Sequence, residues 1–150
     1  MNTTGNFFQL SLSDSFFNNV YLLDKAEFPK PWSLEGWKGL NWKHHLLFGW
    51  KAQEVLNGFA LFCILEGDDA AHLLKICIAS EFRGSGSAQG LWNFSLQELQ
   101  ARAAKSIYLE VETNNMSAIK FYQKIGFTTL RRIQGYYSDG GDALTMQLTI

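Results

Sequence analysis

The sequence has few of the residues and motifs that mark disulfide-stapled or metal-binding proteins. It holds only two cysteines, Cys63 and Cys77, and both stand inside apolar runs. They are typical of reduced core residues of a cytosolic protein and not of a disulfide framework. There is no CxxC pair and no HExxH motif, and the three histidines lack the spacing of zinc ligands. We therefore expect no metal site.

Charge and hydropathy exclude further classes of protein. Thirteen basic residues balance 14 acidic residues, so no basic surface for nucleic acid is expected. No run of about 18 apolar residues could span a membrane. The first 14 residues contain neither the basic segment nor the apolar segment of a signal peptide, which favours a cytoplasmic location. A chain of 150 residues can bury its own core, and we expect one domain over 1–150.

Hydrophobic periodicity predicts strands and helices in alternation. A four-residue turn at 66–69 makes the strands on either side of it antiparallel. We expect an α/β chain built on a mixed sheet. The predicted elements are a helix over 15–27 capped at Ser13 or Asp14, a short helix capped at Ser33, strands over 46–50, 58–65 and 73–79, a helix from about 88 to 105, a strand over 107–113, a helix capped at Asn114 and ended by Gly126, and strands over 128–133 and 143–150.

A glycine-rich segment, Arg83-Gly-Ser-Gly-Ser-Ala88, joins a predicted buried strand to the long helix. Glycines let backbone N–H groups approach a phosphate, and a helix N-terminus adds partial positive charge. Two familiar nucleotide motifs do not fit, because no Lys follows the second glycine and Gln89 replaces the third glycine of a dinucleotide fingerprint. From these residues alone the segment is either an anion-binding loop or an ordinary tight turn.

The same segment matches the pattern [QR]xxGx[GA], and a second block, LEVETNNMSAIKFYQKIGF over 109–127, follows it. Together the two blocks resemble the GNAT acetyltransferase superfamily. The resemblance implies a mixed, mostly antiparallel sheet of six to seven strands flanked by about four helices and splayed at a cofactor cleft. It implies acetyl-CoA as co-substrate, bound by Arg83, Gly84, Ser85, Gly86, Ser87, Ala88 and Asn115 and by the backbone around Ile76 and Ile78.

Other segments resemble the bacterial ribosomal-protein-alanine N-acetyltransferases within this superfamily. The similar segments are Phe28 with Pro31-Trp32-Ser33, then Leu109-Glu110-Val111, and Gly135-Tyr136-Tyr137. Departures from that group include Ser80, Ser87, Gly90 and Gly135. The acceptor is therefore open between a protein N-terminus and a free small amine, and a non-catalytic acetyl-CoA-binding module is a third interpretation.

The resemblance also implies roles for individual side chains. Tyr122 matches the general acid that protonates the leaving thiolate, and Glu110 matches the general base. Glu112 lies on the same strand face and is the competing base. Tyr136 and Tyr137 are candidates for binding the acceptor.

Each of these residues has an alternative that the sequence leaves open. Tyr122 would also serve as a core aromatic, Glu110 as a solvated strand carboxylate and Asn115 as a helix cap. The two tyrosines could simply pack a hairpin loop.

Overall fold

The computed structural model describes residues 5–11, 13 and 15–150. In chain order the elements are β1 (Asn6–Leu10), α1 (Phe17–Glu27), α2 (Leu34–Lys38), β2 (His45–Ala52), β3 (Val55–Cys63), β4 (Ala70–Ile78), a 3-10 turn (Ser80–Phe82), α3 (Ser87–Ala101), β5 (Ser106–Glu112), α4 (Met116–Lys124), β6 (Thr128–Ile133) and β7 (Ala143–Thr149). No helix within these described ranges has the length and hydropathy needed to cross a membrane.

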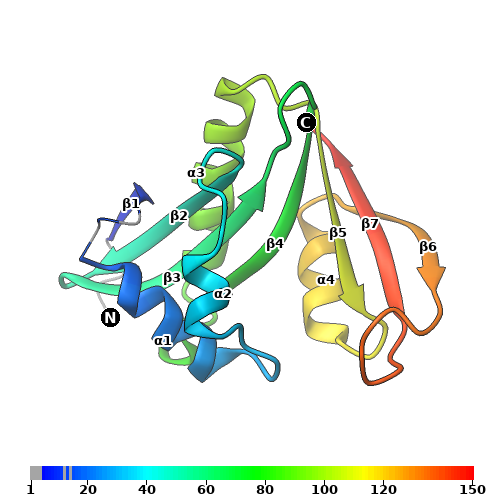
Figure 1. Cartoon of the computed structure of the whole chain (residues 1–150), viewed down its shortest axis with the longest axis horizontal. Coiled ribbons are helices and arrows are strands. Elements are labelled where there is room, and N and C mark those ends of the chain that lie inside the picture. The colour runs from blue at the N-terminus through cyan, green and yellow to red at the C-terminus, as the bar shows by residue number, and fades with distance from the viewer. Residues whose placement is uncertain (1–4, 12, 14) are drawn as a thin grey trace.

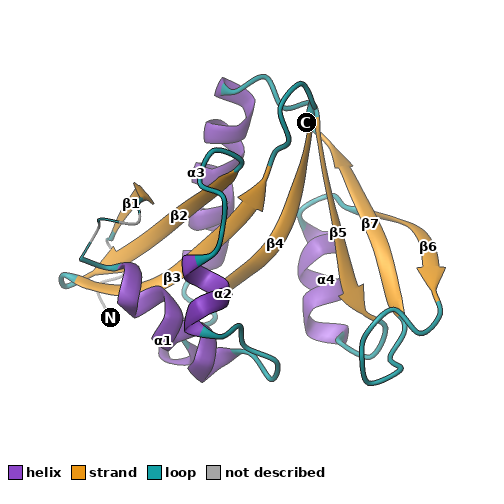
Figure 2. Cartoon of the chain, viewed as in Figure 1, coloured by secondary structure: helices purple, strands orange, loops and turns teal. Residues whose placement is uncertain are grey.

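The strands form one sheet of seven in the order β1-β2-β3-β4-β5-β7-β6 (Figure 1). Every neighbouring pair is antiparallel except β4 and β5, which are parallel. Helices α1 and α2 cover one face of the sheet, and α3 covers the other (Figure 2). The predicted mostly antiparallel sheet with four helices is confirmed, as is the antiparallel pairing on either side of the 66–69 turn.

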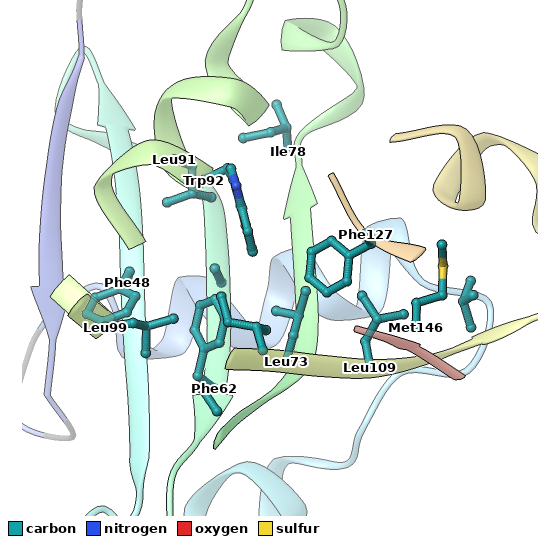
Figure 3. Close-up of a cluster of buried hydrophobic side chains, with 14 of the residues drawn as sticks. Phe48, Phe62, Leu73, Ile78, Leu91, Trp92, Leu99, Leu109, Phe127 and Met146 are labelled. Carbon is teal, nitrogen blue, oxygen red and sulfur yellow. The ribbon is translucent and has the colours of Figure 1, made fainter. Parts of the chain in front are cut away.

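Because successive side chains of a strand point to opposite faces of the sheet, they contribute to two hydrophobic cores, one on each face. In β5 the side chains of Ile107, Leu109 and Val111 are buried, as the alternation predicts. They join the core beneath α3 and α4, where Trp92, Phe127 and Met146 meet (Figure 3). The second core lies beneath α1 and α2 and is rich in aromatic rings.

Two predicted helix starts differ from the structure. Helix α1 begins at Phe17 after Phe16, and no side chain caps it, so Ser13 is not the cap. Asp14, the other predicted cap, lies outside the described residues. Helix α4 is capped by Asn115 and not by Asn114, because the Asn115 side chain accepts a hydrogen bond from the Ala118 N–H group.

The long helix α3 ends four residues earlier than predicted, at Ala101. Ala103 adopts a left-handed backbone with φ of 64°. The N–H groups of Ala103 and Ala104 then bond the carbonyls of Gln100 and Leu99, which closes the last turn. The sequence prediction missed this end because alanine is a strong helix former and rarely adopts positive φ.

Strand β1 was not predicted, and its contact explains the unexpected glycine in α3. A Cβ atom on Gly90 would lie 2.6 Å from the Phe7 ring, so glycine makes room for β1 against the helix. Phe7 stacks on Phe94 one turn further along α3, with ring centroids 6.0 Å apart.

A buried carboxylate, Asp24 of α1, ties the helical layer to the sheet. Its side chain is fully buried and accepts hydrogen bonds from the Trp32 N–H group at 3.0 Å and from the Trp37 indole at 2.8 Å. The Lys75 ammonium of β4 lies 2.7 Å from its other oxygen. Burial lowers the pKa of Lys75, while the hydrogen bond to Asp24 opposes that shift. The ion pair therefore connects α1, α2 and the strand that leads to the glycine-rich loop.

We predict that Asp24→Ala lowers the free energy of unfolding by about 3–5 kcal/mol, because it leaves a buried ammonium without a counter-charge. Chemical denaturation measures this loss. Glu66→Ala, which removes an exposed ion pair with Lys43, should cost under about 1 kcal/mol. The double variant Asp24→Leu/Lys75→Met should recover part of the loss, and a single-variant loss below about 1 kcal/mol would contradict the buried pair.

Candidate active site

The parallel strands β4 and β5 pair over only three positions, Ala70 to His72 against Ser106 to Tyr108. Beyond His72 a register shift between Leu61 and Phe62 of β3 bends β4 away from β5. At Ile76 and Ile78 strand β4 pairs with β3 on one side alone, and Figure 1 shows β4 and β5 diverging. The predicted splay is confirmed, and it leaves one edge of β4 without a neighbouring strand.

The glycine-rich loop follows this open edge and leads into α3. Gly84 and Gly86 have φ of 78° and 86°, and nothing lies within 4 Å of where their Cβ atoms would be. Within the described part of the chain, the N–H groups of Gly84, Gly86 and Ser87 donate to no protein acceptor, and the same holds for Ala88. Several unpaired donors at the start of a fifteen-residue helix form a site suited to phosphate oxygens.

The side chains of the loop are partly engaged with their neighbours. The Arg83 guanidinium forms an ion pair with Glu27 of α1 and remains 60% exposed. Glu27 also accepts a hydrogen bond from the Ser80 N–H group at 3.3 Å. The Ser85 hydroxyl lies 2.6 Å from that of Ser87 and donates to the Phe82 carbonyl. Arg83 therefore brings charge to the loop, but Glu27 already offsets part of it.

Glu110 and Glu112 project from the same face of β5 and have different partners. One Glu110 oxygen lies 2.6 Å from Nε2 of His72, the last β4 residue that pairs with β5. Glu112 accepts from the Lys30 ammonium at 2.9 Å. Glu112 therefore has a cationic partner, which it shares with Asp139, whereas Glu110 faces an imidazole.

Tyr122 lies on α4 and packs against the core on the same face of the sheet as α3. Its ring packs edge-on against Phe127, with the ring centroids 5.7 Å apart. Burial raises the pKa of Tyr122 far above the ordinary range of a phenol. The hydroxyl consequently stays protonated and able to donate at any physiological pH.

Two tyrosines and a lysine lie on the loops beside the two glutamates. The rings of Tyr136 and Tyr137 meet edge-on at 4.9 Å in the loop between β6 and β7. Lys30, between α1 and α2, lies 2.6 Å from Asp139 and 5.1 Å from the centre of the Tyr137 ring. Lys30 thus connects these two loops with β5 through Glu112.

His72 and Lys30 are the site residues that sequence reasoning missed. His72 is 38 positions from Glu110 and Lys30 is 82 positions from Glu112. Only the strand register and the placement of the loops bring these pairs together, so no local pattern could reveal them. Among the described residues, no three His, Cys, Asp or Glu side chains are arranged to hold a metal ion.

Comparison with known proteins identifies the class to which this fold and loop belong. Residues 17–127 match the acetyltransferase (GNAT) family, and the chain belongs to that family. The chain is 27% identical to the [ribosomal protein bS18]-alanine N-acetyltransferase of Salmonella typhimurium, over 89% of this chain and 98% of that protein. The crystal structure of the ribosomal-protein-S18-alanine N-acetyltransferase from Escherichia coli superposes with a TM-score of 0.87, at 25% identity, covering 98% of this chain and 94% of that one.

A shorter similarity links the chain to another kind of acetyltransferase. It is 38% identical to N-alpha-acetyltransferase 30 of Schizosaccharomyces pombe over 72 residues. That alignment spans 48% of this chain and 48% of the yeast protein, so the match extends over about half the length of that relative.

Proposed function

We propose that this chain transfers the acetyl group of acetyl-CoA to an amine, most specifically to the α-amine at the N-terminus of a protein. The observation that carries the proposal is the set of unpaired N–H groups at Gly84, Gly86 and Ser87, next to the open edge of β4. Diphosphate oxygens would accept from these donors, and the pantetheine amides would bond the β4 backbone near Ile76 and Ile78. Membership of the GNAT family supports this choice of ligand.

Glu110 and Tyr122 divide the proton transfers of the proposed reaction. The acceptor nitrogen attacks the thioester carbonyl and loses a proton to Glu110, directly or through water, as its bond to carbon forms. The C–S bond then breaks, and the Tyr122 hydroxyl donates its proton to the departing sulfur. The ion pair between Glu112 and Lys30 supports Glu110 as the base. Asn115 already caps α4, and a contact from it to the cofactor is a further part of the proposal.

The preference for an α-amine rests on chemistry and on the relatives. An α-amine titrates near pH 7.7–8.0, so about a tenth to a sixth of it is neutral at pH 7, whereas lysine titrates near 10.4 and is almost wholly charged. A lysine acceptor would need about 3.4 kcal/mol more help to lose its proton. The Salmonella relative is named a [ribosomal protein bS18]-alanine N-acetyltransferase and the yeast relative an N-alpha-acetyltransferase. Binding of the acceptor peptide by Tyr136 and Tyr137 is part of the proposal, and a cytoplasmic location stays a prediction.

Acetyl-CoA at about 100 times its dissociation constant should stabilise the fold by about 2.7 kcal/mol, seen as a rise in Tm. We expect Gly86→Leu to abolish this rise, because the side chain strains the left-handed backbone and occupies the phosphate site. Gly67→Leu is the matched control, since Gly67 has φ of 81° and equally open surroundings in the β3–β4 turn. A ligand-induced rise that survives Gly86→Leu would remove the loop from the binding site.

Tyr122→Phe should lower kcat by about 10²- to 10⁴-fold and leave the KM for acetyl-CoA nearly unchanged, because the hydroxyl acts on the sulfur only as the bond breaks. Steady-state kinetics with a fixed acceptor measures both quantities. Tyr21→Phe, on α1 and in the other core, should have the wild-type kcat. If Tyr122→Phe turns over at the wild-type rate, Tyr122 serves only the core.

A peptide with a free N-terminus should be acetylated efficiently, and the same peptide with a blocked N-terminus and an internal lysine should not. Mass spectrometry locates the added acetyl group. Modification of the lysine in preference to a free N-terminus would contradict the acceptor assignment. Activity on a polyamine or an amino sugar, with no activity on peptides, would point to a small-amine enzyme instead.

A further inference from the structure

The imidazole of His72 and the carboxylate of Glu110 form a close pair at the point where β4 and β5 part. Nε2 lies 2.6 Å from one glutamate oxygen, and the two side chains are 24% and 19% exposed. His72 stands opposite Tyr108 in the register, and these two residues form the last pair between β4 and β5. The pair therefore sits on a rigid part of the sheet beside its opening.

The ring of His72 is held in one orientation. It stacks on Tyr108, with centroids 4.4 Å apart and planes 14° from parallel. Within the described residues, its only hydrogen-bonding contact is with Glu110, so Nδ1 has no protein partner. Stacking on Tyr108 restricts rotation of the imidazole ring. Nε2 therefore stays directed at the Glu110 carboxylate.

From this geometry we propose that His72 is a positioning residue for the transfer reaction: in its neutral form it donates from Nε2 to one oxygen of Glu110 and leaves the other oxygen to take the acceptor's proton. This role rests on the proposed function. A bond to one carboxylate oxygen fixes the plane of the carboxylate and therefore the direction of its second oxygen.

Protonation of His72 would make Glu110 a weaker base. An imidazolium beside Glu110 stabilises the ionised carboxylate and weakens it as a base, and its charge repels an acceptor ammonium. The titratable groups around His72 are Glu110 and Tyr108 of β5, Cys63 opposite His72 on β3, Asp68 of the β3–β4 turn, and Tyr136 of the β6–β7 loop.

Two variants separate the hydrogen bond from the titration. His72→Phe keeps a ring to stack on Tyr108 but has no donor, and we expect kcat to fall about ten- to a hundredfold, the range for one hydrogen bond to a charged group. His72→Gln keeps an N–H donor that does not titrate. The ratio of its kcat to the wild-type kcat should rise as pH falls from 8 to 5.5. With one acceptor used throughout, ionisation of that acceptor cancels in the ratio.

A double variant distinguishes positioning from a general structural role. Because His72 acts through Glu110, Glu110→Gln/His72→Phe should be no slower than Glu110→Gln alone. Additive losses, or a kcat ratio for His72→Gln that is flat with pH, would overturn the proposal.

A readout without substrate keeps this test distinct from the test of the proposed function. In ¹⁵N spectra of the imidazole at pH 8, the wild-type protein should carry the His72 proton at Nε2, and Glu110→Ala, which removes the acceptor, should lose that preference. A wild-type proton at Nδ1 would contradict the pairing directly. If the spectra show the pair but the wild-type chain transfers no acetyl group to any amine, the proposed function fails and the positioning role with it.

Discussion

The aromatic contact between Trp92 and Phe127 is the interaction on which the open sheet depends. Strands β4 and β5 share only three paired positions, so backbone bonds alone hold the two halves of the sheet weakly. Trp92 and Phe127 both lie in the core beneath α3 and α4 (Figure 3). Their ring centroids are 5.6 Å apart, and the Tyr122 ring packs on Phe127 at 5.7 Å. One continuous core therefore crosses the division, and the sheet opens at its edge without dividing the protein. The same packing fixes the side chain proposed as the general acid.

On the opposite face, two ion pairs join helix α1 to β4 and to the glycine-rich loop. Asp24 of α1 pairs with Lys75 of β4, and Glu27 three residues later pairs with Arg83 of the glycine-rich loop. The spacing of three places both carboxylates on one side of the helix. Helix α1 consequently contacts both the strand and the loop proposed to bind acetyl-CoA. The segment after α1 contains Lys30, which pairs with Glu112 and Asp139 near the tyrosines proposed to bind the acceptor. The proposed sites for acetyl-CoA and for the acceptor therefore both contact α1 or the segment that follows it.

Local patterns in the sequence were enough to predict much of this arrangement. Alternation of apolar and polar residues predicted the faces of β5. The two blocks at 83–88 and 109–127 predicted the family, and the resemblance to that family implied the splayed sheet and the glycine-rich loop. Predictions failed where two neighbouring residues compete for one role, as with Asn114 and Asn115, or where a residue adopts an unfavoured backbone, as with Ala103. Pairs such as His72 with Glu110 join distant parts of the chain, and the register that unites them is a property of the whole sheet. The catalytic roles remain predictions.

Amide hydrogen exchange with and without acetyl-CoA tests the central claim most directly, namely that the ligand binds along β4 and on the glycine-rich loop. The N–H groups of Gly84, Gly86, Ser87 and Ala88 have no partner among the described residues, so they should exchange quickly in the free protein. Acetyl-CoA should slow exchange over 73–78 and 84–88 and leave β1 and β2 unchanged. Slowed exchange confined to other strands, with 84–88 still exchanging quickly at saturating acetyl-CoA, would contradict the account.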